Sequence, residues 1–183
     1  MISKKYTSDY RLENVTDKDG KIKTVPVYCG TYYRLASERD KLKQVRLYSL
    51  IACGFYWVFF FFGLAFDSGS LRQIYVSLPY VFSCLPAAFY SFSVYNFSKS
   101  VTNPPEKGFT RKQRDAISEK IPQNAFISFL LSCGGMLGMV FYFIFRYKTY
   151  GGVQDVLILV SLSVMATASL FVFSLKRHFK MQP

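Results

Sequence analysis

"RLYSLIACGFYWVFFFFGLAFDSGS", residues 46–70, is the stretch of sequence that decides the fold. Between Arg46 and Asp67 it contains 20 residues without a charged side chain. A helix of that length extends about 30 Å, which matches the hydrocarbon core of a bilayer. A helix at the surface of a soluble domain would carry a polar stripe at every third or fourth position, and this stretch has none. It therefore predicts a membrane-spanning helix.

Three more uncharged runs follow along the chain. They cover residues 73–98, 121–145 and 156–175, with 26, 25 and 20 residues. Strands of a soluble sheet also give uncharged runs, but those usually have about four to eight residues. The sequence therefore predicts an all-α membrane protein with a bundle of four transmembrane helices. Short connections make neighbouring spans antiparallel, so we expect two helical hairpins, residues 47–98 and 124–175.

Basic residues are distributed unevenly among the connections. The 183-residue chain has a net charge of +12, and 20 of its 23 Lys and Arg lie before residue 47, in residues 99–120 or after Leu175. By the positive-inside rule, both termini and the middle connection are expected in the cytoplasm of a multi-pass plasma-membrane protein. We also expect these basic segments to contact anionic lipid headgroups. A nucleic-acid partner is not expected, because no recognisable binding module accompanies the charge.

The leading segment, residues 1–30, predicts a short cytoplasmic β-hairpin. Two β-capable runs flank Asp19-Gly20, a dipeptide typical of tight hairpin turns. Pro26 restricts the second run to an edge strand. No apolar stretch with a cleavage site precedes the first span, so that span is expected to act as both targeting signal and anchor.

Two charged segments next to the spans predict surface helices. Residues 31–46 place Leu35, Leu42 and Val45 at helical spacing, which favours a juxtamembrane amphipathic helix, with a solvated linker helix as the alternative. Residues 99–123 form a basic loop in which "NPPEKG" interrupts any helix and "TRKQRDAISEKI" predicts a short interfacial helix. Residues 176–183 complete the chain as a basic cytoplasmic tail.

Small residues recur at helical spacing within the last three spans. Such stripes let helices approach closely, and van der Waals contact is the main source of helix association in lipid. Pro79 and Pro86 also predict a kink in the second span. We expect the small residues to form a helix-packing or partner interface. The candidate set is Ser83, Ala87, Ser91, Gly134, Gly138, Ser163 and Thr167.

The spans contain few side chains that could take part in catalysis or metal binding. No span interior holds an ionisable residue, and such residues usually mark proton relays and ion pathways. Asp155, at the start of the fourth span, is interpreted as a helix cap, and the single histidine, His178, lies in the basic tail. We therefore predict no catalytic residue, no cofactor and no metal site. The cysteines lack zinc-site spacing and are interpreted as small packing residues: Cys29, Cys53, Cys84 and Cys133.

Three classes of function follow from this pattern. We expect a non-enzymatic subunit or interaction protein of a membrane complex, with a partner membrane subunit or a second copy as its neighbour. The alternative is an oligomeric small transporter or channel component, and an enzyme is least expected. An internal duplication is a further hypothesis, because residues 34–54 and 114–134 share five identities at an offset of 80.

Overall fold

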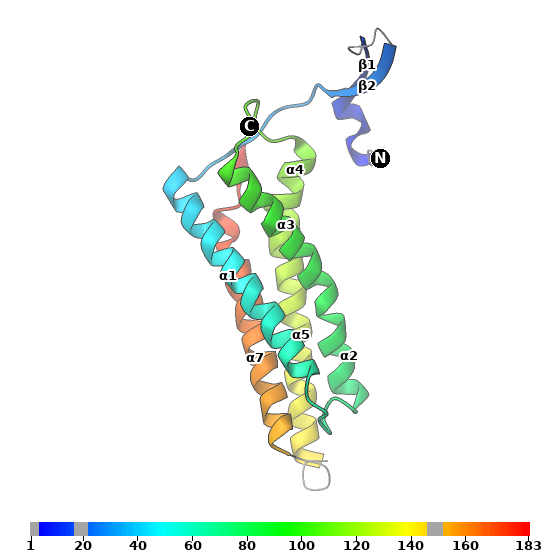
Figure 1. Ribbon diagram of the computed structural model, residues 1–183, viewed down its shortest axis with the longest axis vertical. Coiled ribbons are helices and arrows are strands. Elements are labelled where there is room, and N and C mark those ends of the chain that lie inside the picture. Colours follow the sequence, from blue (N-terminus) through cyan, green and yellow to red (C-terminus); the bar gives the residue numbers. More distant parts are fainter. Residues whose placement is uncertain (1–3, 17–21, 146–151) are drawn as a thin grey trace.

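The computed structural model describes residues 4–16, 22–145 and 152–183. Four helical rods form a bundle, as Figure 1 shows. Each rod is long and apolar enough to cross a membrane, which confirms the prediction of four long apolar helices. The first rod is α1 (Arg39–Leu64), and the second is α2 (Ile74–Phe82) with α3 (Cys84–Thr102). The third rod consists of α4 (Arg111–Asp115), the π-helical turn η2 (Ala116–Lys120) and α5 (Ile121–Phe145). The fourth is α7 (Val153–Ser174) with the 3-10 turn η3 (Leu175–Arg177).

The rods pack in a closed ring. Helix α1 contacts α3 and α7, and α5 contacts α2, α3 and α7. One end of the bundle carries residues 31–38, 103–110 and 175–183, and we call it the basic end; the opposite end, with residues 65–73, is the far end. Large apolar side chains on the outward faces stay exposed, among them Val58, Phe92 and Ile144. Such a surface suits contact with lipid and is rare on soluble bundles.

The second rod is broken in its middle. Helix α2 ends at Phe82 and α3 begins at Cys84, with Ser83 in a turn between them. Pro79 lies inside α2 and Pro86 in the first turn of α3. Each proline lacks an N–H, so the ladder of helix hydrogen bonds is interrupted on both sides of Ser83. The break lies where the two prolines predicted a kink.

The start of the first rod differs from the expected juxtamembrane helix over residues 31–46. Helix α1 begins at Arg39 and runs without interruption into the apolar stretch. Residues 34–35 instead form β3 (Arg34–Leu35), which pairs antiparallel with β4 (Met181–Gln182). Leu42 and Val45 are buried in the bundle core. Extending an existing helix adds one hydrogen bond per residue without a new nucleation cost, which favours a single rod.

In the connection over residues 99–123, charged residues again extend the neighbouring rods instead of forming a separate helix. Helix α3 continues to Thr102, and the segment expected as a separate interfacial helix is the first part of the third rod. Thr110 caps this rod: its hydroxyl accepts from the Gln113 N–H, and the Gln113 side chain accepts from the Thr110 N–H. A bridge between Tyr33 and Phe109 joins the connection to the segment before α1.

Residues 4–16 and 22–28 form a short helix and a two-stranded sheet. A 3-10 helix η1 (Lys4–Asp9) leads into β1 (Tyr10–Thr16), which pairs antiparallel with β2 (Ile22–Tyr28). The predicted hairpin strands are thus present, while Asp19-Gly20 lies outside the described residues. The sheet projects beyond the basic end (Figure 1), and its strand β2 contacts the third rod where the Tyr28 hydroxyl accepts a hydrogen bond from the Arg111 N–H at 3.0 Å.

Candidate functional site

The structure divides the predicted interface residues into two groups. Ser83 and Ala87 on the second rod and Gly138 on α5 are buried inside the bundle. Ser91 and Gly134 are half-buried, and the Ser91 hydroxyl accepts a hydrogen bond from the Trp57 indole at 3.1 Å. Ser163 and Thr167 are exposed on the outer surface of α7. One group therefore faces neighbouring helices, and the other remains open.

Gly138 of α5 lies against the backbone of α2. A Cβ atom added at Gly138 would clash with the backbone carbonyl oxygen of Tyr75. At Gly134 an added Cβ would lie 3.8 Å from Pro79 Cβ, which is an ordinary contact. The Gly134–Gly138 pair thus serves helix packing within this chain, and Gly138 is the position of the two at which a side chain does not fit.

Hydroxyl groups meet in the middle of the bundle, next to the break in the second rod. The Tyr56 hydroxyl donates to Ser83, lying 2.8 Å from its Oγ and 2.9 Å from its carbonyl oxygen. The Ser83 hydroxyl in turn donates to the Tyr80 carbonyl at 2.7 Å. Ser128 and Ser169 join this cluster, with their Oγ atoms 3.3 Å apart. All four rods contribute, so the interior is more polar than the lack of ionisable residues suggested.

A single buried carboxylate organises the far end. Asp155 Oδ1 accepts from the Ser70 N–H at 2.8 Å, and Oδ2 accepts from the Gly152 N–H at 2.9 Å and the Tyr142 hydroxyl at 3.2 Å. The N-cap of α7 is Gly152 rather than Asp155; Asp155 lies three residues later, where its side chain accepts from the Gly152 N–H and also ties α7 to α5 and to the connection after α1. Local sequence patterns do not predict the Ser70 and Tyr142 partners, because both lie in other segments of the chain.

A second buried carboxylate occupies the basic end. Asp115 accepts from the Lys5 amine at 2.9 Å, the Tyr6 hydroxyl at 3.0 Å and the Arg114 guanidinium at 2.7 Å. These contacts fix η1 against the start of the third rod. The hydrogen bond to Asp115 raises the pKa of the Lys5 amine above its ordinary value. Sequence reasoning missed this site, because its partners lie about a hundred positions apart.

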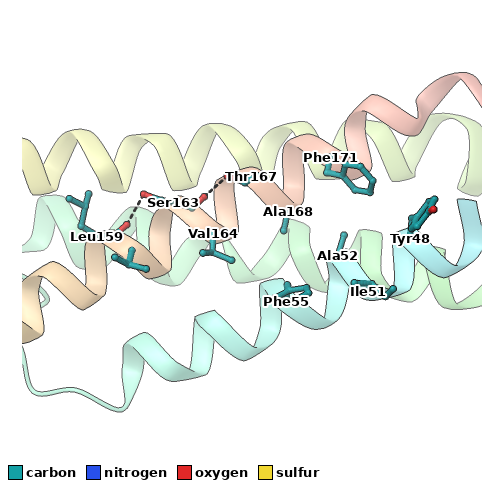
Figure 2. A pocket seen from close by; sticks show the side chains of 11 residues that line it. Tyr48, Ile51, Ala52, Phe55, Leu159, Ser163, Val164, Thr167, Ala168 and Phe171 are labelled. Carbon is teal, nitrogen blue, oxygen red and sulfur yellow. Dashed lines mark hydrogen bonds between the residues drawn. The ribbon is translucent and has the colours of Figure 1, made fainter.

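The exposed pair Ser163 and Thr167 lies in a groove between α1 and α7. The groove has a volume of about 630 Å³ and runs along the apolar part of both helices. Figure 2 shows both hydroxyls donating to backbone carbonyls of their own helix, Ser163 to Leu159 and Thr167 to Ser163, each at 2.8 Å. Because these donors are already used, the wall is chemically apolar. The lining residues are Tyr48, Ile51, Ala52, Phe55, Leu159, Val160, Ser163, Val164, Thr167, Ala168 and Phe171.

The groove closes toward the basic end. There the rings of Tyr48 and Phe171 meet edge to face, with centroids 6.4 Å apart. Near its middle the walls are formed by small side chains, Ala52 and Ala168 (Figure 2). The two helices therefore present a long apolar groove that is open along one side.

In the described residues, no group of three or more His, Cys, Asp or Glu side chains is arranged to hold a metal ion. All four cysteines are described and carry free thiols; Cys29 is exposed and Cys53 is buried.

Comparison with protein-family models, with curated proteins and with solved structures finds no match to this chain.

Proposed function

We propose that the protein is a multi-pass membrane protein that acts as a non-enzymatic subunit or interaction protein of a membrane complex. The groove between α1 and α7 is the face that receives a transmembrane helix of the partner. This groove is the observation that carries the proposal, because it is the place where predicted interface residues remain open in the bundle.

The shape and chemistry of the groove suit a helix in lipid. Small side chains on its walls, Ala52, Ser163 and Ala168, permit a close approach of another backbone. The Ser163 and Thr167 hydroxyls are satisfied within α7, so a partner does not have to supply hydrogen bonds. Exposed Phe55 and Phe171 at the rim provide large apolar contact areas.

The proposal includes an orientation. The segments before residue 47, over residues 99–120 and after Leu175 hold 20 of the 23 basic residues, and their described parts lie at the basic end or extend from it, as the course of the chain in Figure 1 indicates. The positive-inside rule then supports placing this end, with both termini, on the cytoplasmic side of the plasma membrane. The basic residues there would contact anionic lipid headgroups.

Co-purification from native membranes in mild detergent tests the proposal. Ser163→Trp combined with Thr167→Trp fills the groove, and we expect it to release a partner that copurifies stoichiometrically with the wild type. The matched control is Val140→Trp with Ile144→Trp, which places the same two indole side chains on an exposed face of α5. That control is expected to retain the partner.

Two results would count against the proposal. Retention of the partner by the groove variant would show that binding occurs elsewhere. A wild type that purifies only with itself, as a homo-oligomer that the groove variant disrupts, would favour the oligomeric transporter or channel component instead. The central hydroxyl cluster of Tyr56, Ser83, Ser128 and Ser169 is the observation that supports this second candidate.

A further inference from the structure

A second hollow lies at the basic end, between α3 and the third rod. It has a volume of about 1070 Å³, slightly above the usual range for small-molecule sites. Its walls combine aromatic, amide and cationic side chains from α3, α4, η2 and α5, with Tyr10 of β1 at the rim. None of its lining residues is acidic. We call this hollow the basic cleft.

The wall formed by α3 changes along its length from aromatic to polar to cationic side chains. Phe89 and Phe92 lie nearest the middle of the rod, Ser93 and Asn96 follow, and Lys99 lies toward the basic end. Ten residues of helix from Phe89 to Lys99 span about 15 Å. That distance is about half the hydrocarbon thickness of a bilayer, the depth of one leaflet.

Three lysines from separate segments converge on the cleft. Lys99 belongs to α3, Lys112 to α4 and Lys120 to η2. Among the described residues none of the three forms an ion pair with an Asp or Glu. The nearest buried carboxylate, Asp115, is already occupied by Lys5 and Arg114. Three uncompensated positive charges around one hollow favour an anionic ligand.

We propose that the basic cleft binds one anionic phospholipid. Its phosphate lies among Lys99, Lys112 and Lys120, and an acyl chain follows Phe89 and Phe92 toward the middle of the bundle. Amide groups between these levels, on Asn96, Gln123 and Asn124, face the glycerol and ester region. The inference rests on the proposed membrane location and is independent of the proposed partner.

The aromatic wall distinguishes a lipid from a soluble phosphate compound. Phe89 and Phe92 are 64% and 67% exposed, although they lie on the same wall as the lysines. A soluble anion would use only the cationic rim, whereas a lipid buries these rings as well. Basic pockets between transmembrane helices are a recurrent arrangement for anionic lipid headgroups.

Lipid titration onto the purified full-length protein tests the proposal. Native mass spectrometry in detergent gives the Kd of the first bound lipid, for phosphatidylglycerol and for phosphatidylcholine with identical chains. We expect phosphatidylglycerol to bind more tightly, and Lys99→Gln with Lys112→Gln and Lys120→Gln to weaken it at least about tenfold. The matched control, Lys41→Gln with Lys107→Gln and Lys180→Gln, removes three exposed lysines outside the cleft and is expected to change that Kd less than about twofold.

Two further measurements separate the possible ligands. Phe89→Ser with Phe92→Ser is expected to weaken phosphatidylglycerol at least about fivefold while leaving the melting temperature unchanged, because both rings are exposed. Glycerol 3-phosphate, the soluble headgroup analogue, is expected not to displace the lipid at equal concentration. Displacement by glycerol 3-phosphate would assign the site to a soluble phosphate compound and overturn the lipid proposal.

Three other results would also overturn it. Equal weakening by both lysine triples would indicate diffuse surface charge rather than a site. No weakening by the cleft triple, or none by the phenylalanine pair, would place the lipid elsewhere. Loss of the copurifying partner is not expected from any of these variants, so failure here and failure of the groove proposal are distinguishable.

Discussion

Asp155 Oδ1 accepts a hydrogen bond from the backbone N–H of Ser70 at 2.8 Å, across 85 positions of sequence. The contact joins the first turn of α7 to the connection between α1 and α2. Since Tyr142 of α5 donates to the other oxygen of the same carboxylate, one buried side chain links the third and fourth rods to the connection between the first two at the far end.

We expect Asp155→Ala to destabilise the bundle strongly. It leaves the Ser70 and Gly152 amides without this acceptor and removes one hydrogen bond of the Tyr142 hydroxyl, and a buried donor left unsatisfied costs about 1–3 kcal/mol. Thermal unfolding in detergent measures the loss. Asp67→Ala is the control at the same end, because its ion pair with Arg72 is exposed and worth about 0–1 kcal/mol. Similar melting temperatures for the two variants would contradict the assigned role.

Tyr56 and Tyr90 provide a matched pair for the central hydroxyl cluster. Both side chains are fully buried, but Tyr56 donates to Ser83, whereas the Tyr90 hydroxyl lies near Ser169 without hydrogen-bond geometry to any described residue. Tyr56→Phe should lower stability by about 1–2 kcal/mol, because Ser83 loses its donor at the break in the second rod. Tyr90→Phe should be neutral or stabilising. A larger loss for Tyr90→Phe in the same melting assay would refute this reading.

Gly138 should tolerate no side chain. Gly138→Ala drives a methyl group against the Tyr75 carbonyl oxygen, so α5 and α2 must separate, at a cost of about 1–3 kcal/mol. Gly54→Ala is the control, because an added Cβ there has no neighbour within 4 Å among the described residues and alanine favours the helix. Differential scanning fluorimetry of both variants in detergent should show a lower melting temperature only for Gly138→Ala.

Thiol labelling tests the proposed orientation. In a Cys29→Ser background, Asp67→Cys places an exposed thiol at the far end and Glu106→Cys places one at the basic end. An impermeant maleimide should label Asp67→Cys on intact cells and should reach Glu106→Cys only after permeabilisation. Ser68 is unsuitable as a reporter because it is buried. Labelling of Glu106→Cys on intact cells would reverse the topology.

The spans were predictable because length without charge is a local property of the sequence. The strands at residues 10–16 and 22–28 were also predictable, since their signal lies in adjacent residues. The conformation of Leu35 was not predictable. Its spacing from Leu42 and Val45 fits a helix, yet it lies in β3 and pairs with Met181 of β4, which is remote in sequence. Local periodicity carries no information about such a partner.

The candidate interface was only partly predictable for a similar reason. Small residues on a helix indicate a close approach but do not say which neighbour approaches, so Gly138 and Ser163 looked equivalent in the sequence. Asp115 and Asp155 acquire their roles from donors supplied by other segments. The duplication hypothesis stays open, although residues 34–38 are extended or bent whereas the corresponding residues 114–118 are helical.

The pairing of β3 with β4 has a consequence for how the chain is made. The ribosome adds Met181 146 positions after Leu35, which at about 5–20 residues per second takes roughly 7–30 s. Throughout that interval β3 has no strand beside it, and the position of Phe179 against Phe97 is vacant. A chaperone or insertion factor that attends the nascent chain therefore meets an unpaired strand edge that the finished protein no longer offers.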